Sequence, residues 1–392
     1  MPDPANDLSY IINELAEERE HYYNAVSAPI IQTSNFVFNK VSDLTNAFAD
    51  EMSGYLYSRG LNPTVEILRR KLAALDGAED CLVFNSGASA IFAGVLANVK
   101  AGDHIVSVKA PYTWAWKMFD CILPRFGITT TYIDGTRVEN WANASRPNTV
   151  LYYLESPNSW DFAMQDIPAV SALAKSRGIT TFIDNSYCTP IFQNVIAMGV
   201  DLAMQTATKY IGGHSDTLGG VLSGSKQMIK KIFDSEYLNI GSGIQPFNAW
   251  LLIRGLRTLP ARLERITLTT ATVLDFLKNH PKIEGVIFPF DEGFPQLELA
   301  RKQMKNAGGL FTILLRTRKR ESIVRFCESL KHIMMAVSWG GHESLAIPKC
   351  AGIPEGEFDG ANPEHRYVRI YVGLEEAAYL IEDLRQALEQ VI

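Results

Sequence analysis

Short apolar segments alternate with helical patterns between about residue 80 and residue 225. Several of these segments are apolar on both faces and carry polar residues only at their C-terminal ends, which is typical of strands in a parallel sheet. The segments are CLVF (81–84), HIVSV (104–108), TVLYYLE (149–155), TTFID (180–184) and LAMQTATK (202–209). Their connections carry helical patterns such as DIPAVSALAKSRG (166–178). The alternation predicts an α/β unit whose ligands bind beyond the carboxyl ends of the strands.

Start and stop signals predict a helix over residues 63–76. Asn62 can cap the helix, Pro63 suits its first position and Gly77 can end it. The spacing places four apolar residues on one face, namely Val65, Leu68, Leu72 and Leu75.

The pattern changes from about residue 246 onward. GGLFTILLRT (308–317) and YVRIYVG (367–373) predict strands flanked by helices. The last 20 residues predict an amphipathic helix with one apolar face, formed by Ala377, Leu380, Ile381, Leu384 and Leu388. We therefore expect three parts: an N-terminal arm (1–50), a large domain (51–245) and a smaller C-terminal α+β domain (246–392).

Composition and charge narrow the class of protein. The chain has 392 residues, long enough for two domains, and a net charge of −6 without a basic block, which argues against a nucleic-acid partner. The apolar stretch SAIFAGVLANV (89–99) is shorter than the ~18–20 residues of a membrane helix. The N-terminal segment is acidic and shows no signal-peptide pattern. We expect a soluble, cytoplasmic protein with no membrane partner.

The cysteines and histidines indicate neither a disulfide framework nor a metal site. The five cysteines are scattered, with no CxxC or Cys/His cluster. His214 and Asp216 lie close in the sequence, but no further ligand type completes a site around them.

Polar groups at the ends of two apolar segments indicate an anion site and a buried acid. Ser86, Gly87, Ala88 and Ser89 open a predicted helix, whose first N–H groups favour an anion. The spacing matches neither GxGxxG nor a Walker loop. Asp184 ends an apolar strand, where a carboxylate needs a partner such as a protonated pyridine nitrogen. Taken singly, the first feature is also explained by a strand-to-helix turn, and the second by a helix cap or a loop ion pair.

Two cationic residues add a reactive amine and a carboxylate binder. Lys209, in TATKYIGGHSD (206–216), ends an apolar segment, where a lysine can act as a nucleophile or base. Thr206 and Thr208 beside it offer hydroxyls to phosphate oxygens. Arg369 lies on a predicted strand and can bind a carboxylate through two N–H groups. A solvated lysine and a structural ion pair are the alternatives for each residue alone, whereas the four features together describe pyridoxal phosphate holding an amino acid.

The chain resembles the pyridoxal-phosphate enzymes of cysteine and methionine metabolism, the cystathionine synthase and lyase group of fold type I. The resemblance runs from about residue 28 to the C-terminus. It is carried by YSRGLNPT (57–64), NSGASAI (85–91), ESPNS (155–159), FIDNSY (182–187), TATKYIGGHSD (206–216), LIRGLRTLPARL (252–263), SWGGHESL (338–345) and VRIYVGLE (368–375). It implies a mostly parallel sheet in a large domain and a smaller C-terminal α+β domain.

The resemblance also implies a role for each matching residue. Lys209 is implied to bond to pyridoxal 5'-phosphate and to act as the base, Asp184 to pair with the ring nitrogen, and Tyr112 to stack on the ring. The implied phosphate ligands are Gly87, Ala88, Thr206 and Thr208, with Tyr57 and Arg59 of a neighbouring subunit. The implied substrate ligands are Arg369, Ser338, Trp339 and Ser159. Tyr112 and Tyr57 are implied to assist catalysis. The shared site implies a dimer, and the family implies a tetramer of two dimers with the arm crossing between subunits.

Three positions favour the cystathionine β-lyase branch of this family. Val337 stands where the synthases and γ-lyases that handle cystathionine usually carry Glu, and Trp339 gives the motif its SWGGHESL form. Ser159 stands where most of the family has Asn. The expected reaction is β-elimination of L-cystathionine, or a related cysteine thioether, to homocysteine, pyruvate and ammonia.

Other activities remain open at this point. Val337 also resembles methionine γ-lyase, and γ-replacement on an activated homoserine ester is a further reaction of the family. A non-catalytic regulator that binds pyridoxal phosphate is a remote alternative. Trp114 and Trp116 either line an apolar pocket with Trp339 or pack in the core.

Overall fold

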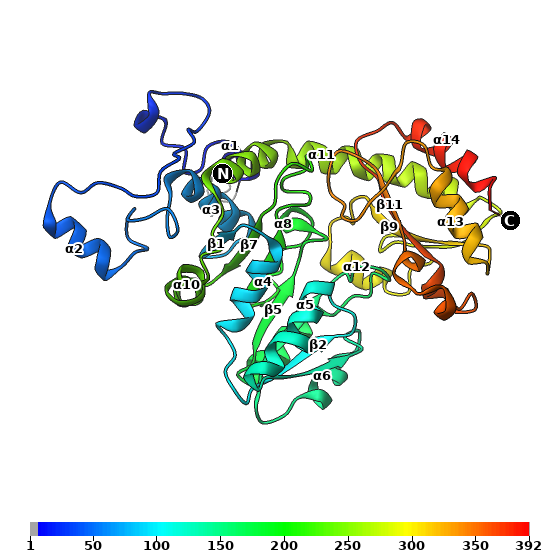
Figure 1. Cartoon of the computed structure of the whole chain (residues 1–392), viewed down its shortest axis with the longest axis horizontal. Helices are drawn as coiled ribbons and strands as arrows, with labels where there is room; N and C mark the ends of the chain where they lie inside the picture. The colour runs from blue at the N-terminus through cyan, green and yellow to red at the C-terminus, as the bar shows by residue number, and fades with distance from the viewer. Residues whose placement is uncertain (1–6, 392) are drawn as a thin grey trace. The chain divides into compact units, whose positions relative to one another are not determined.

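The computed structural model describes residues 7–391, which form two compact units (Figure 1). Unit 1 contains residues 7–156, Met164–Gly212 and Asp216–Arg257. Unit 2 contains Pro157–Ala163, Gly213–Ser215 and residues 258–391. The expected division into an arm (1–50), a large domain (51–245) and a small domain (246–392) stays a prediction.

Unit 1 is built on a seven-stranded sheet with the strand order β1-β7-β6-β5-β4-β2-β3. The strands are β1 (Asp80–Phe84), β2 (His104–Val108), β3 (Thr129–Ile133), β4 (Thr149–Glu155), β5 (Thr180–Asp184), β6 (Leu202–Thr206) and β7 (Gly220–Gly224). Strand β7 runs antiparallel to both of its neighbours, and the other pairs are parallel. The mostly parallel α/β sheet predicted from the sequence is therefore confirmed.

Two strands and one boundary differ from the sequence prediction. Strand β3 is a threonine-rich edge strand with partly exposed side chains, and β7 begins and ends with glycine, so neither shows a long apolar run. The predicted strand 202–209 ends at Thr206. Beyond that point the chain turns, and the Gly212 N–H donates to the Ala207 carbonyl oxygen at 2.7 Å.

Helices bury both faces of this sheet. Ile105 of β2 packs in one core with Ile91 of α4, whereas the next residue, Val106, packs in a second core with Val170 of α7. The alternation follows from the period of two in a strand. The helices of unit 1 are α1 (Leu8–Asn13), α2 (Val41–Ala49), α3 (Pro63–Asp76), α4 (Gly87–Leu96), α5 (Thr113–Lys117), α6 (Val138–Ala144), α7 (Ile167–Ser176), α8 (Thr189–Phe192), α9 (Lys226–Ile232) and α10 (Leu238–Ile240).

Helix α3 has the predicted ends. The Asn62 side chain accepts the Thr64 N–H at 3.0 Å, and Gly77 follows the helix with a φ of 64°. A left-handed residue at this position favours glycine. Leu68 and Leu72 are fully buried, while Leu75 is only half-buried.

Unit 2 contains a five-stranded sheet with the order β10-β11-β12-β9-β8. Its strands are β8 (Ile283–Ile287), β9 (Leu310–Leu315), β10 (Met334–Met335), β11 (Leu345–Pro348) and β12 (Tyr367–Tyr371). Its helices are α11 (Pro246–Lys278), which begins in unit 1, α12 (Leu297–Gln303), α13 (Arg320–Ser329) and α14 (Ala377–Leu388). The predicted strands at β9 and β12 and the predicted final helix are confirmed. Across residues 7–391, no helix is long and apolar enough to cross a membrane.

Candidate active site

A buried carboxylate stands at the end of β5 in unit 1. Asp184 is 8% exposed, and its side chain accepts the Ser186 N–H at 2.9 Å. Burial raises the pKa of Asp184, while the Ser186 hydrogen bonds and the charge of Lys209 oppose this shift. A carboxylate in this setting favours a cationic partner that is itself removed from water.

An anion cradle lies at the N-terminus of α4, next to β6. A β-carbon placed on Gly87 would lie 2.8 Å from the Cβ of Thr206, so only glycine permits this close approach. The Ser86 side chain caps the helix by accepting the Ser89 N–H at 3.2 Å. The N–H groups of Gly87 and Ala88 therefore begin a ten-residue helix beside the Thr206 hydroxyl, an arrangement that suits a phosphate.

The turn after β6 holds Lys209. The Lys209 N–H donates to the Thr206 carbonyl oxygen at 3.2 Å, and the Thr208 hydroxyl accepts the Gly219 N–H at 3.1 Å. Lys209 is half-buried, and it lies near enough to Asp184 for its charge to oppose the rise in the pKa of Asp184 that burial causes. The predicted acid, amine and two threonines thus lie together at the carboxyl ends of β5 and β6.

Two residues that sequence reasoning missed tie these groups together. The Ser186 hydroxyl accepts the Thr206 N–H at 2.7 Å, so Ser186 joins the Asp184 loop to β6. Glu155 pairs in register with Asp184 and accepts the Tyr112 N–H at 2.6 Å. Glu155 also ends an apolar segment, and this signal was sufficient to find it.

Tyr112 precedes α5 and is 40% exposed. Burial raises the pKa of its hydroxyl, and the charges of Asp184 and Glu155 raise it further. Tyr112 is therefore neutral and lies in the field of the predicted cofactor acid. Trp114 and Trp116 in α5 are 56% and 42% exposed, so the alternative that they pack in the core is wrong.

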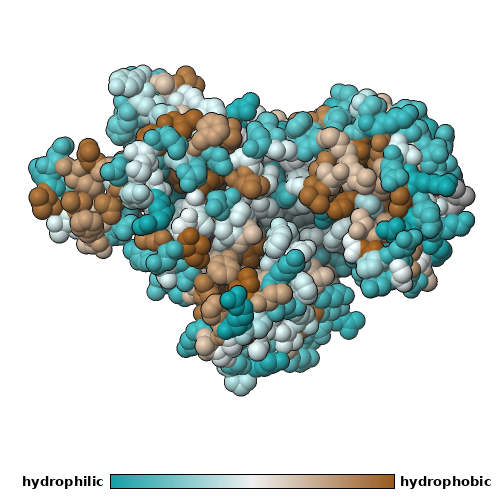
Figure 2. Space-filling model, in the orientation of Figure 1, coloured by the Kyte–Doolittle hydropathy of each residue, from teal (hydrophilic) through white to brown (hydrophobic). Residues whose placement is uncertain are grey.

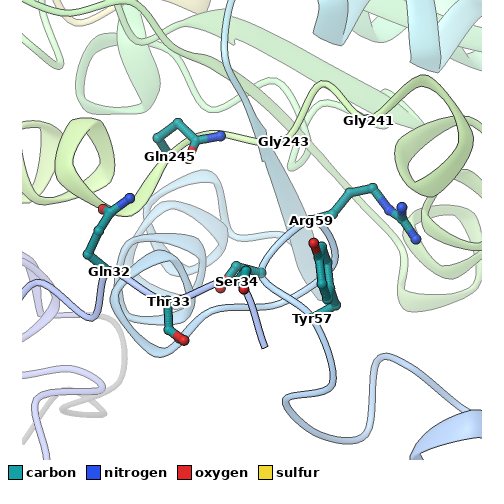
Figure 3. A pocket seen from close by; sticks show the side chains of 9 residues that line it. Gln32, Thr33, Ser34, Tyr57, Arg59, Gly241, Gly243 and Gln245 are labelled. Atoms are coloured by element: carbon teal, nitrogen blue, oxygen red, sulfur yellow. The ribbon is translucent and has the colours of Figure 1, made fainter. Parts of the chain in front are cut away.

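Tyr57 and Arg59 line a different pocket of unit 1, with a volume of about 330 Å³ (Figure 3). Gln32 and Gln245 lie on one side of this pocket, and Tyr57 and Arg59 on the other. The Arg59 guanidinium lies 5.6 Å from the centre of the Tyr57 ring. Asp184 and Lys209 do not belong to the pocket lining, so the two groups of predicted ligands occupy different places in one chain.

Unit 2 holds the residues predicted to bind the substrate. Arg369 lies on β12, and its Nη1 donates to the Ser159 carbonyl oxygen at 3.0 Å. Ser338 and Trp339 follow β10 and are half-buried. Ser338 has a φ of 85°, a conformation that costs a non-glycine residue about 1–3 kcal/mol and is concentrated at functional sites.

The donors of unit 1 fit pyridoxal 5'-phosphate. Asp184 offers a buried carboxylate to a protonated ring nitrogen, and Lys209 offers an amine to the aldehyde. The close approach of Gly87 to Thr206 brings the first N–H groups of α4 beside the Thr206 hydroxyl, a set of donors that suits a phosphate. The fold and this donor set define a fold type I enzyme that depends on pyridoxal phosphate.

The chain belongs to the family of Cys/Met metabolism PLP-dependent enzymes, whose model matches residues 10–389. It is 36% identical over 381 residues to an L-methionine γ-lyase of Treponema denticola, covering 94% of each chain. It is 33% identical to a cystathionine γ-lyase of Bacillus subtilis, covering 94% of this chain and 95% of the relative. The crystal structure of metB from Corynebacterium glutamicum superposes with a TM-score of 0.90 at 30% identity over the whole of both chains. The predicted family, fold and cofactor are confirmed.

Proposed function

We propose that the protein is a carbon–sulfur lyase that converts L-cystathionine to homocysteine, pyruvate and ammonia by β-elimination. The observation that carries the proposal is the proximity of the buried Asp184, at the end of β5, to Lys209, in the turn after the neighbouring strand β6. The Asp184 carboxylate can stabilise a protonated cofactor ring, and the Lys209 amine can move a proton. The preference for the Cβ–S bond rests on Trp339 and Ser159, which resemble the β-lyase branch, and on Val337, which replaces the Glu usual in the synthases and γ-lyases that handle cystathionine.

Each residue has a defined part in this reaction. Pyridoxal phosphate, when bound, supplies an electron sink for the substrate carbanion. Lys209 Nζ removes the proton from Cα, and Asp184 keeps a proton at the ring nitrogen by remaining a carboxylate beside it. Arg369 binds the substrate α-carboxylate, with Ser338, Trp339 and Ser159 around it. The Cβ–S bond breaks, Lys209 or Tyr112 returns a proton to sulfur, and water releases pyruvate and ammonia.

γ-Elimination of methionine is the second candidate. It is supported by the relatives named γ-lyases and by Val337, which also resembles methionine γ-lyase. γ-Replacement is supported by a 31% identical O-succinylhomoserine sulfhydrylase of Pseudomonas aeruginosa, which covers 92% of this chain and 90% of the relative. Val337, in place of the usual Glu, argues against γ-replacement.

We propose that the active enzyme is a homo-oligomer built from dimers. Tyr57 is 45% exposed, and its pocket lacks the residues of the Asp184 site, so Tyr57 and Arg59 are available to a neighbouring copy. Exposed apolar side chains also gather over α2 and the preceding loop (Figure 2), including Val37, Val41 and Phe48 at 94%, 81% and 68% exposure. A contiguous apolar surface of this kind is typical of a subunit interface.

Thiol release by variants of Lys209 tests the lyase proposal. The wild-type holoenzyme is expected to release a thiol from L-cystathionine, and Lys209→Ala is expected to reduce the rate by ~10²–10⁴-fold or more, because the base is lost. Lys175→Ala, an exposed lysine on α7, is the control and should keep the wild-type rate. A Lys209→Ala variant with near-normal turnover would refute the assignment.

A further inference from the structure

The segment Pro157–Ala163 follows β4 in the sequence but belongs to unit 2, where its main chain is hydrogen-bonded to side chains of β9 and β12. The buried Thr312 hydroxyl of β9 donates to the Trp160 carbonyl oxygen at 2.8 Å. Arg369 pairs in register with Thr312, so both side chains project from the same face. Arg369 Nη1 donates to the Ser159 carbonyl oxygen of this segment at 3.0 Å. The segment is therefore fixed to two neighbouring strands through its main chain.

The Trp160 indole is placed against the guanidinium of Arg369. The Arg369 Cζ lies 4.8 Å from the centre of the Trp160 ring, within the range of a cation–π contact. The half-buried Lys349 also lies near this ring, with its Nζ 5.5 Å from the ring centre, but its charge is paired with Glu364 at 2.9 Å. Arg369 is the cation nearer to the indole.

A guanidinium stacked on an indole is well prepared to bind a planar carboxylate. Arginine loses considerable side-chain freedom when it is held in one geometry, and its fork must be aligned to bind a carboxylate through two N–H groups. Stacking fixes the plane of the guanidinium and consumes none of its five N–H donors. The bond to Ser159 fixes one nitrogen. Together, the two contacts orient the fork before a ligand arrives.

We propose that Trp160 is a positioning residue that holds the Arg369 guanidinium in the plane required for the substrate α-carboxylate. This inference rests on the proposed function in one respect, namely that Arg369 binds that carboxylate. Trp160 itself touches Arg369 and takes no part in proton transfer. Its removal therefore affects the binding of ligands that carry the carboxylate, and leaves the chemistry of Lys209 in place.

The test measures how tightly glycine and glycinamide bind to the holoenzyme. Binding is monitored through the absorption spectrum of the cofactor. Both probes carry an amine and no leaving group, but only glycine carries a carboxylate. Trp160→Leu is expected to weaken glycine binding by about 3- to 30-fold, the range of a cation–π contact. Glycinamide binding should change by less than about twofold, because the contact that is lost serves only the carboxylate. Trp160→Phe keeps an aromatic face and should restore most of the glycine affinity.

A matched control removes a similar contact elsewhere in unit 2. Arg385 of α14 lies 5.4 Å from the centre of the ring of Phe276 on α11. Neither residue belongs to β12, the strand that carries Arg369. Phe276→Leu should leave the glycine affinity unchanged. If the Trp160→Leu variant does not bind the cofactor, the Trp160→Met variant is used in its place. Methionine is unbranched and adapts to irregular gaps in the packing.

Two results would overturn the inference. Glycine affinity within about twofold of wild type in Trp160→Leu or Trp160→Met would show that the indole does not orient Arg369. Equal weakening of glycine and glycinamide would show a general disturbance of the fold. These results do not depend on turnover: a protein without lyase activity but with the expected difference between the probes would refute the proposed reaction and retain the role of Trp160.

Discussion

At the scale of the residue, Asp76 is a buried acid away from the predicted chemistry. It lies at the end of α3, accepts Gln205 Nε2 at 2.6 Å and accepts the Ser223 hydroxyl at 2.5 Å. Burial raises the pKa of Asp76 to about 7, although both hydrogen bonds lower it. Helix α3 is thereby joined to β6, the strand that leads to Lys209, and to β7.

Because the pKa of Asp76 is raised by folding, the protonated form stabilises the folded state. The unfolded chain loses this proton near pH 4 and the folded chain near pH 7, so stability should fall as the pH rises through that window and level off above it. Asp76→Asn does not titrate and can keep a hydrogen bond to each partner, since its oxygen can accept from Gln205 Nε2 and its NH2 group can donate to the Ser223 hydroxyl. It is expected to remove this fall, and to be more stable than wild type above pH 7. Urea unfolding of both proteins between pH 5 and 9 measures the difference; parallel curves would contradict it.

Gly87 provides a second prediction at this scale. Gly87→Ala places a methyl group 2.8 Å from the Thr206 Cβ, so the N-terminus of α4 and β6 must separate. Overpacking of this kind typically costs about 1–3 kcal/mol, and we expect cofactor affinity to fall by about 5- to 150-fold. Equilibrium binding of pyridoxal phosphate to the apoenzyme measures the change. Gly356→Ala, where a β-carbon meets nothing within 4 Å, is the control and should bind like wild type.

The residues that the sequence revealed are those with a local signal. Asp184 and Lys209 stand out because each ends an apolar segment, and Gly87 because small residues follow a strand. Ser186 has no such signal, since its link to β6 appears only when β5 and β6 pair. Asp76 looks like an ordinary residue at the end of a helix, and its burial depends on two strands that come more than a hundred residues later.

At the scale of the element, a buried ion pair holds α1 against α3. Lys71 and Glu17 have fully buried side chains that lie 3.1 Å apart, and Lys71 Nζ also donates to the carbonyl oxygens of Ile11 and Ile12 at 3.0 and 3.2 Å. Arg257 of α11 binds Glu17 at 3.0 Å. Burial lowers the pKa of Lys71, and Glu17 opposes this shift. The N-terminal segment is thereby attached to the body of unit 1.

Removing the charge of Glu17 should release this attachment. Glu17→Gln leaves a buried lysine without its counter-ion, and losing one partner of a buried pair costs about 3–5 kcal/mol. We expect a loss in this range in urea unfolding and faster proteolysis of the N-terminal segment. Glu14→Gln, at an exposed position, should change stability by less than ~0.5 kcal/mol. Equal stability of the two variants would show that the pair contributes nothing.

The elements differ in how far the sequence predicts them. The caps of α3 and the apolar runs of β1, β2, β4 and β5 are local signals, and the structure has them where expected. Strand β3 has no apolar run because it lies at the edge of the sheet, where its side chains stay partly exposed. Strand β7 has none because its glycines let neighbouring backbone come close to it. At Gly220, for example, a β-carbon would lie 2.2 Å from the Ser86 carbonyl oxygen. Such a requirement is set by a neighbour in space and leaves no periodic pattern.

At the scale of the whole molecule, the exposed apolar surface of α2 predicts an assembly. Phe48→Asp introduces a charge into this surface, and burying it at an interface would be unfavourable. We expect the variant to sediment as a smaller species than wild type and to lose activity, because Tyr57 and Arg59 would no longer reach a neighbouring copy. Phe126→Asp, at a residue that is 52% exposed and lies outside α2, is the control. A Phe48→Asp variant with the mass and activity of wild type would exclude this surface from the interface.

The most direct test of the proposed function is the identity of the keto acid formed from L-cystathionine by the purified holoenzyme. β-Elimination predicts pyruvate with homocysteine in equal amounts, together with ammonia. 2-Oxobutyrate with cysteine would mean that the Cγ–S bond is cleaved, and the weight placed on Val337 and Trp339 would be wrong. No keto acid from L-cystathionine or L-methionine, with the cofactor bound, would contradict the assignment as a carbon–sulfur lyase.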